Sequence, residues 1–332
     1  MSEKIARRQF LGSALAVAGA VGLNRALADD TPASSMAAPG DIPIIDCHIH
    51  LFDPTRPQGV PWPAKNNAIL YKPALPSRYR DVIKGFGIVG AIEIECSTWL
   101  EDNQWVLDVS DKDTIMVGTI GNLEPGKAEF AQQLERFHKN PLFRGIRYGN
   151  LWGRDLGAEL SKPQFIADLK LLANAGLVLD TANPNLKLLA DVARLTDLVP
   201  ELRIVIDHLP SLPRPTDSIQ YDQSMKQLGQ RPQVYVKVSE VLRHGADGKV
   251  AYDLASYRAT LDQIYETFGP DRLLFGSDWP NSDPFGTYSQ VLSIVREYFT
   301  SKGHDVAEKY FWKNSIAAYR WIKRDAAQPQ PS

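Results

Sequence analysis

Two histidines, His48 and His50, stand two positions apart at the end of an apolar run that begins at Ile44. Side chains alternate between the faces of a strand, so a strand over residues 44–52 places both imidazoles on one face, with Asp46 one step before them. Imidazole nitrogens bind divalent metals and transfer protons near neutral pH. Core histidines satisfied by hydrogen bonds are the structural alternative. A facing pair at a strand end favours a metal or catalytic site.

Further polar residues end other apolar runs along the chain. Each has a local alternative: Glu95 could form a ladder of satisfied carboxylates with Glu93, Asp180 could cap a turn, and Asp278 could be a turn residue. Turns and caps do not require three histidines and an aspartate to end the first, sixth and eighth strands, so one shared site is the better interpretation. The candidate site residues, in chain order, are His48, His50, Glu95, Arg147, Asp180, His208 and Asp278.

The elements that must position these residues alternate between strand and helix. Such alternation argues for a parallel sheet, and eight strands favour closure into a single-domain α/β fold, a (β/α)8 TIM-like barrel over residues 42–325. In such a barrel the carboxyl ends of the strands meet on one face. The predicted strands are 44–52, 91–96, 115–120, 143–148, 177–180, 203–208, 234–238 and 273–278. The predicted helices are 103–110, 127–139, 163–175, 186–199, 251–268 and those from 288 onward.

A long loop over residues 53–76 follows the first strand and is rich in Pro, Gly and Asn. Long ordered loops tend to carry function. Trp62 and Tyr71 in this loop, and Trp99 beyond it, are candidates to line a pocket. The alternative is that these aromatic side chains only pack the loop against the barrel.

The composition is that of an ordinary globular protein, with 332 residues of which 44% are hydrophobic and 23% charged. A net charge of −2 gives no electrostatic reason to expect nucleic acid or a membrane surface as partner. The two cysteines, Cys47 and Cys96, both fall in predicted buried strands, which predicts apolar thiols rather than disulfides or a zinc–thiolate site. No strand is followed by a G-x-G-x-x-G or Walker sequence, so nothing supports nucleotide binding.

The N-terminal residues carry an export pattern. Arg7-Arg8 precedes an apolar run that is shorter than the ~20 residues of a spanning helix, and Ala26-Leu27-Ala28 supplies small residues for cleavage. We expect a twin-arginine signal peptide over residues 1–28, a linker over 29–41, a periplasmic mature protein and no stable membrane insertion after cleavage. An uncleaved amphipathic anchor is the alternative.

Five short motifs stand at predicted strand ends: Asp46-x-His48-x-His50, Arg144-Gly145-Ile146-Arg147, Asp207-His208, Val236-Lys237-Val238-Ser239 and Gly276-Ser277-Asp278-Trp279-Pro280. Together they resemble the amidohydrolase superfamily, in the amidohydrolase-related branch (amidohydrolase 2) that holds lactonases of the 2-pyrone-4,6-dicarboxylate, sugar-lactone and sulfomuconolactone types. The resemblance covers the chain from Ile42 to about Trp321. It implies a distorted (β/α)8 barrel that hydrolyses an ester, lactone or amide, or that decarboxylates an aromatic acid.

The resemblance also implies a metal site. Family members hold zinc or manganese through the strand-one pair, a strand-six histidine and the strand-eight aspartate, which here are His48, His50, His208 and Asp278. Many members add a histidine on strand five, where this chain has Asp180, and strand four does not end in a lysine that could be carboxylated to bridge two metals. We therefore expect one Zn²⁺ per chain, with Glu95 as a candidate additional ligand. Mn²⁺, or catalysis without metal, are the alternatives.

Ring opening needs a group that stabilises the carbonyl oxygen and a base that activates water. We expect Asp278 to be the base and then to protonate the departing ring oxygen, and His208 to polarise the carbonyl or steady the water. Arg147 and Arg243 are candidates to clamp an anionic group of the substrate. For Arg243, ordinary surface ion pairing is the alternative.

These expectations predict a hydrolase of a small anionic lactone, such as a muconolactone or sulfomuconolactone of aromatic catabolism. A sugar-acid lactonase and a nonoxidative aromatic acid decarboxylase are the rival reactions, and only the decarboxylase releases carbon dioxide. A periplasmic binding protein on a degenerate barrel is the rival from another class, recognisable by tight binding without turnover. A homodimer is left open as the assembly.

Overall fold

The computed structural model describes residues 42–215, 218–245 and 247–330. The predicted signal peptide (1–28) and linker (29–41) lie outside these residues. Within the described residues, no helix has the length and apolar character needed to cross a membrane.

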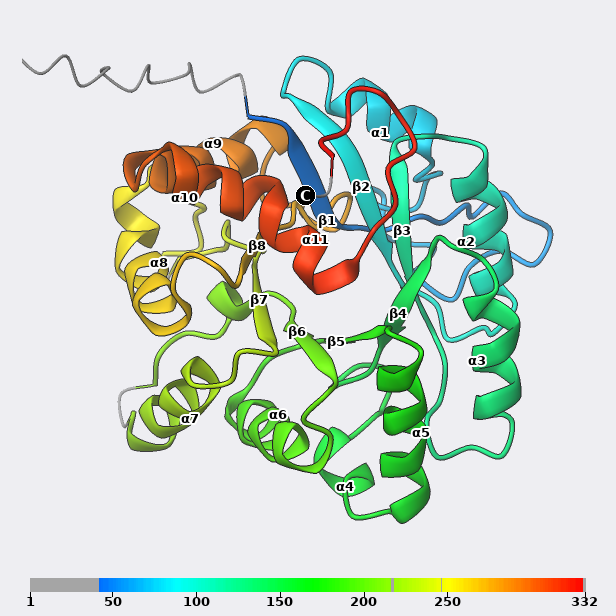
Figure 1. The fold of residues 1–332 in the computed structure, drawn as a ribbon. Helices are drawn as coiled ribbons and strands as arrows, with labels where there is room; N and C mark the ends of the chain where they lie inside the picture. The colour runs from blue at the N-terminus through cyan, green and yellow to red at the C-terminus, as the bar shows by residue number, and fades with distance from the viewer. Residues whose placement is uncertain (1–41, 216–217, 246, 331–332) are drawn as a thin grey trace, which may run out of the picture. The chain divides into compact units, whose positions relative to one another are not determined.

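An eight-stranded parallel sheet forms the centre of the described part of the chain, with its strands in sequence order (Figure 1). Two backbone hydrogen bonds join the last strand to the first: Asp278 N donates to His48 O at 2.8 Å, and His50 N donates to Trp279 O at 2.8 Å. The predicted (β/α)8 barrel is thereby confirmed. The strands are β1 (Ile44–Ile49), β2 (Ile88–Ile94), β3 (Met116–Gly121), β4 (Phe143–Arg147), β5 (Val178–Thr181), β6 (Arg203–Ile206), β7 (Val234–Val238) and β8 (Leu273–Phe275).

Helices surround the sheet and cover its outer face (Figure 1). Helix α1 was missed, because residues 53–76 were read only as a loop and the helix begins at the proline that ends that loop. Strand β2 begins at Ile88, three residues before the predicted start at 91. The helices are α1 (Pro76–Val82), α2 (Asp102–Asp111), α3 (Phe130–His138), α4 (Leu156–Glu159), α5 (Pro163–Asn174), α6 (Leu186–Leu198), η1 (Leu209–Ser211), α7 (Ile219–Gly229), α8 (Ala255–Phe268), α9 (Tyr288–Ser301), α10 (His304–Glu308), η2 (Lys309–Lys313) and α11 (Asn314–Tyr319).

Apolar side chains form two buried clusters on opposite sides of the sheet. The larger cluster packs the outer faces of the strands against the helices. The smaller one fills the barrel interior with alternate strand residues, such as Ile45 and Ile92, together with Tyr319 and Trp321 from the C-terminal segment. Both cysteines are buried free thiols, as predicted.

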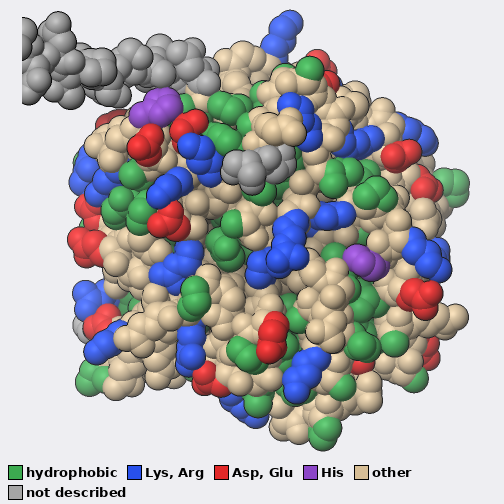
Figure 2. All heavy atoms as spheres, in the orientation of Figure 1, with side chains coloured by type: hydrophobic (Ala, Val, Ile, Leu, Met, Phe, Trp, Pro, Cys, Tyr) green, Lys and Arg blue, Asp and Glu red, His purple; other side chains and the backbone are tan. Residues whose placement is uncertain are grey.

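The C-terminal helix α11 lies across the barrel strands in the view of Figure 1. Arginines at the starts of β4 and β6 bind its last turn: Arg144 Nη1 donates to Arg320 O at 2.9 Å, and Arg203 Nε donates to Ala318 O at 2.8 Å. Several Lys and Arg side chains gather near the middle of this face (Figure 2). The end of α11 is therefore fastened to the strands by guanidinium–carbonyl hydrogen bonds.

The side chain of Asp46 does not share a face with the two histidines, which corrects the expectation from strand alternation. Asp46 Oδ2 accepts hydrogen bonds from Tyr79 OH at 2.8 Å and Tyr288 OH at 2.9 Å, on helices α1 and α9. Asp46 Oδ1 accepts from Ser277 N at 2.9 Å. The pairing register of β1 with β2 shifts between Asp46 and Ile49, and this irregularity breaks the alternation. Asp46 thus ties β1, β8 and two helices together outside the barrel.

Candidate active site

Residues from the first, sixth and eighth strands meet at the carboxyl end of the barrel. His48, His208 and Asp278 each offer one ligand atom, and these atoms lie within 4.8 Å of one another. Asp278 Oδ1 is 3.1 Å from Nε2 of His50, 3.5 Å from Nε2 of His48 and 4.0 Å from Nε2 of His208. All four side chains are buried. The structure thus brings together the four residues on which the sequence interpretation depends.

Strained backbone conformations cluster at this end of the barrel. In the described part of the chain, six non-glycine residues have a left-handed φ, and five of them follow the ends of strands β4 to β8. Such conformations cost about 1–3 kcal/mol each and concentrate at functional sites. The five residues are Trp152, Asn183, His208, Glu240 and Asp278.

The donor atoms of the site fit a divalent metal. His50 Nδ1 lies 2.8 Å from the carbonyl oxygen of Ile94, which can only accept a hydrogen bond. Nδ1 therefore carries the hydrogen, and Nε2 of the neutral ring carries a free lone pair. That lone pair faces Asp278 Oδ1 at 3.1 Å, and two acceptors this close require a proton or a cation between them. Buried His48 has no hydrogen-bond partner on either ring nitrogen. Imidazole nitrogens with a carboxylate oxygen are a donor set that suits zinc and similar ions.

Burial sets the ionisation of these groups. Loss of solvent lowers the pKa of His50 to about 4, and it lowers the pKa of His48 and of His208 well below the ordinary value. The same cause raises the pKa of Asp278 to about 7. The imidazoles are therefore neutral at pH 7, which is the form that binds metal.

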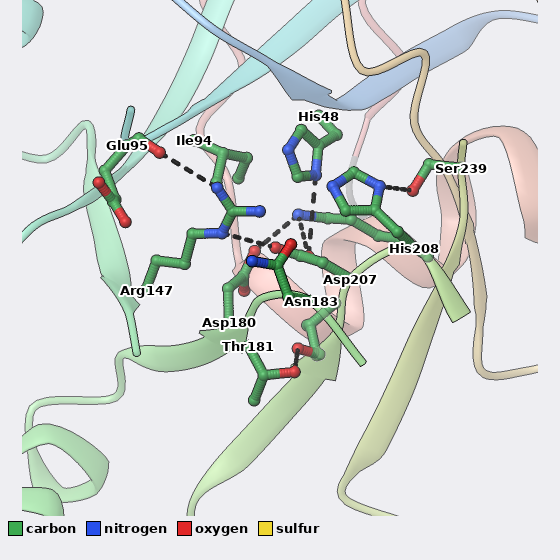
Figure 3. Close-up of polar contacts among 12 residues, drawn as sticks. His48, Ile94, Glu95, Arg147, Asp180, Thr181, Asn183, Asp207, His208 and Ser239 are labelled. Atoms are coloured by element: carbon green, nitrogen blue, oxygen red, sulfur yellow. Dashed lines mark hydrogen bonds and ion pairs between the residues drawn. The ribbon is translucent and has the colours of Figure 1, made fainter. Parts of the chain in front are cut away.

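Glu95 is not brought to this group. Its carboxylate accepts hydrogen bonds from Trp152 Nε1 at 3.3 and 3.2 Å and from Ser97 N at 3.2 Å, and Arg154 Nη1 lies 3.7 Å away. Figure 3 shows the Glu95 carboxylate directed away from His48. Alternation along β2 explains the difference, because its neighbour Ile94 fills the barrel interior. Glu95 therefore anchors the loop after β4 and does not join the expected ligands.

The two arginines expected to bind an anionic group differ in position. Arg147 lines the cavity above the site, but its Nε lies 3.0 Å from Asp207 Oδ2 and its Nη1 donates to the Glu95 carbonyl at 3.3 Å (Figure 3). Arg243 is half-buried and is not among the residues that line this cavity. The structure thus places Arg147, and not Arg243, at the site.

The cavity has a volume of about 180 Å³, enough for a small ring compound rather than a single water molecule. Of the three aromatic residues proposed to line a pocket, Trp62 lines this cavity, and Trp62 and Trp99 line a second pocket beside α2. Tyr71 lines neither. The residues that line the cavity of about 180 Å³ are His50, Trp62, Cys96, Arg147, Leu151, Trp152, Asn183, His208, Glu240 and Asn281.

Six of the lining residues were not predicted as site residues from the sequence: Cys96, Leu151 and four with polar groups, namely Trp152, Asn183, Glu240 and Asn281. Asn281 Nδ2 donates to Asp278 Oδ2 at 2.7 Å, and burial raises the pKa of Glu240 to about 8. Each of the four polar residues follows the carboxyl end of a strand, where the loops of such a barrel build the site. That positional rule was the available signal, although it does not say which loop residue turns inward.

Comparisons with known proteins identify a family and a shared fold. The family model described as Amidohydrolase matches residues 45–321. An L-fucono-1,5-lactonase of Burkholderia ambifaria is 24% identical over 286 residues, which cover 83% of this chain and 95% of that protein. A Burkholderia multivorans amidohydrolase solved with bound zinc has a TM-score of 0.75 at 20% identity, covering 84% of this chain and 100% of that one. Amidohydrolase 2 of Bifidobacterium longum subsp. infantis has a TM-score of 0.65 at 24% identity, with coverages of 85% and 100%. The two structures show a shared fold.

Proposed function

This chain belongs to the amidohydrolase family, and from that premise we propose that it hydrolyses a lactone in the cavity above His48, His208 and Asp278. The observation that carries the proposal is geometric: Oδ1 of buried Asp278 lies within 4.0 Å of a ring nitrogen of His48, His50 and His208, beside a cavity lined by His50 and His208. Burial raises the pKa of Asp278 to about 7. A base with that pKa operates well at neutral pH. The lactonase activity named for the relative from Burkholderia ambifaria supports the same reaction.

The side chains divide the chemistry as follows. Asn281 binds one oxygen of Asp278, leaving Oδ1 to accept a proton from the attacking water. His208, whose Nδ1 lies 2.8 Å from Ser239 Oγ, presents Nε2 to the cavity and orients the water or the carbonyl oxygen. Asp278 then returns the proton to the ring oxygen as its bond to the carbonyl carbon breaks, which yields a hydroxy acid. A divalent metal held by this group would polarise the carbonyl and lower the pKa of water.

The charge of the cavity favours a neutral, hydroxylated lactone over the anionic one expected from the sequence. Arg147 is the one cation among the lining residues, and its guanidinium is already shared between Asp207 and a backbone carbonyl. A carboxylate or sulfonate on the substrate would thus lack the paired arginine clamp.

The remaining lining groups suit a polyhydroxylated ring. Asn183 and Asn281 each offer a donor and an acceptor, and Glu240, with its pKa raised by burial to about 8, can donate as a neutral acid at pH 7. Trp62 and Trp152 add apolar ring faces. We therefore propose a sugar-acid lactone as the substrate class.

A matched panel of lactones tests this proposal. Purified protein is assayed by acid release against neutral sugar-acid 1,5- and 1,4-lactones and against muconolactone, sulfomuconolactone and 2-pyrone-4,6-dicarboxylate. We expect the highest kcat/KM for a neutral sugar lactone. A higher kcat/KM for an anionic lactone would contradict the proposed substrate class and support the expectation from the sequence. Release of carbon dioxide from an aromatic acid would show that the protein is a decarboxylase and not a hydrolase.

We propose zinc as the metal, at about one ion per chain, with manganese as the competing identity. Elemental analysis of purified protein should find that ion, and removal by a chelator should lower kcat by about 10²-fold, reversibly on re-addition. His48→Ala should lose the ion, whereas His138→Ala, a substitution on the exposed side of α3 and outside every candidate metal group, should retain it. Full activity in protein stripped of metal would contradict the requirement.

We also propose a periplasmic location, which rests on the Arg7-Arg8 motif and the apolar run that follows it. Cell fractionation checks it: Arg7→Lys/Arg8→Lys should keep the protein in the cytoplasm, because the twin-arginine pair would then be lost. An unchanged periplasmic fraction in that variant would contradict export by this route.

A further inference from the structure

A lysine lies inside the barrel beneath the site, and the chemistry proposed above does not use it. Lys237 on β7 is completely buried, with Nζ 2.6 Å from Asp180 Oδ2 and 3.0 Å from Asp207 Oδ1. The same oxygen of Asp180 accepts a hydrogen bond from Tyr319 OH at 2.9 Å, and Nζ lies 5.3 Å from the centre of the Tyr319 ring. The ammonium thus lies between the carboxylates of Asp180, in β5, and Asp207, just after β6, and beside an aromatic ring from α11.

The charges form an alternating row across the barrel. Asp180 pairs with Lys237, Lys237 with Asp207, and Asp207 with Arg147, whose Nε is 3.0 Å from Asp207 Oδ2 (Figure 3). The charges of the two carboxylates and the two cationic side chains cancel. Buried ion pairs, however, recover in attraction little more than they lose in hydration, and apolar side chains would often serve stability as well. The stability of the fold therefore does not by itself explain why four charged side chains are buried here.

Asp207 connects the row to the candidate site. Its Oδ1, the oxygen contacted by Lys237, lies 3.8 Å from His48 Nδ1. Its other oxygen pairs with Arg147, which lines the cavity. Asp207 also directly precedes His208 in the chain. Any shift of the Asp207 carboxylate would thus change contacts of a candidate metal ligand and of a pocket residue together.

We propose that Lys237 is a positioning residue whose ammonium acts as a built-in cation between Asp180 and Asp207, holding Asp207 where it orients His48 and Arg147. The kinetic consequence of this role rests on the lactone hydrolysis proposed above. The role also gives Asp180 a purpose at the strand-five position. Asp180 binds an ammonium group instead of a metal, and a second divalent ion beside that ammonium would be repelled.

The test removes one charge of each sign, so that the barrel stays balanced. Asp180→Asn/Lys237→Met leaves the pair between Asp207 and Arg147 intact. We expect kcat to fall by about 10–100-fold with KM within a few-fold, and the Zn²⁺ dissociation constant, from competition with a chromophoric chelator, to rise by about 10-fold or more. The matched control is Asp191→Asn/Lys187→Met, the same exchange in an exposed ion pair on α6, which should change neither quantity.

Wild-type kcat and Zn²⁺ affinity in the Asp180→Asn/Lys237→Met variant would overturn the proposal, because Lys237 would then serve charge balance alone. Lys237→Arg keeps the charge and decides the matter if the double variant does not fold. The longer, forked group cannot keep both contacts, so we expect reduced kcat and weaker Zn²⁺ binding, and unchanged values would again overturn the role. If the wild-type protein opens no lactone, the proposed function fails, while the dissociation constants still decide the role of Lys237.

Discussion

Asp278→Asn is expected to lower kcat for lactone hydrolysis by about 10³-fold, within the range that general acid–base groups contribute. The amide cannot take the proton from water or return it to the ring oxygen, yet it keeps the shape of the side chain and its contact with Asn281. KM should change little, because the pocket walls are untouched. Steady-state kinetics on the best lactone of the panel measures both quantities.

The pH dependence of the same reaction provides a second readout. Because burial raises the pKa of Asp278 to about 7, the base form increases as the pH rises, and kcat/KM should climb to a plateau above that pH. A bound divalent cation stabilises the carboxylate and moves this limb to lower pH. The limb should disappear from any residual activity of Asp278→Asn. A variant that keeps the limb and more than about a tenth of wild-type kcat would show that another group is the base.

Asp46→Ala is expected to lower the free energy of unfolding by about 3 kcal/mol, because it leaves four buried donors without their acceptor. Those donors are the hydroxyl groups of Tyr79 and Tyr288 and the backbone amides of His48 and Ser277. Urea unfolding at pH 7 measures the change. Tyr288→Phe removes one of the same hydrogen bonds and should cost about 1 kcal/mol. Equal losses in the two variants would show that the carboxylate does not act as a shared hub.

The barrel could be predicted because its signal is repeated. Eight apolar strands alternate with amphipathic segments, and an error of a few residues at one boundary, as at Ile88 in β2, leaves the topology unchanged. Helix α1 escaped prediction because its seven residues follow a proline-rich loop and carry little apolar periodicity. Its Tyr79, which binds Asp46, therefore had no place in the sequence interpretation.

The sequence predicted those site residues whose position follows directly from the end of a strand. His48, His50, His208 and Asp278 converge because their strands do. Glu95 fails the same rule, because the face that a side chain takes depends on register. Register shifts in β1 and β2 are set by pairing with neighbours and not by local sequence.

Side chains held by partners distant in sequence could not be predicted at all. Lys237 meets Asp180 across 57 residues and Arg147 meets Asp207 across 60, and neither pairing leaves a local pattern. The same holds for the loop residues Trp152 and Glu240, whose left-handed backbone turns their side chains toward the cavity. Such contacts depend on how the loops pack, which the strand–helix alternation leaves open.

The hydroxyl group of Tyr319 on α11 binds Asp180 inside the barrel, so this part of the barrel is completed by a segment that follows every candidate ligand in the chain. A nascent chain halted before α11 would already contain every candidate ligand, but it would lack Tyr319 and its hydrogen bond to Asp180. A fusion partner that displaced α11 would, for the same reason, remove a hydrogen bond inside the barrel and would not disturb the protein surface alone.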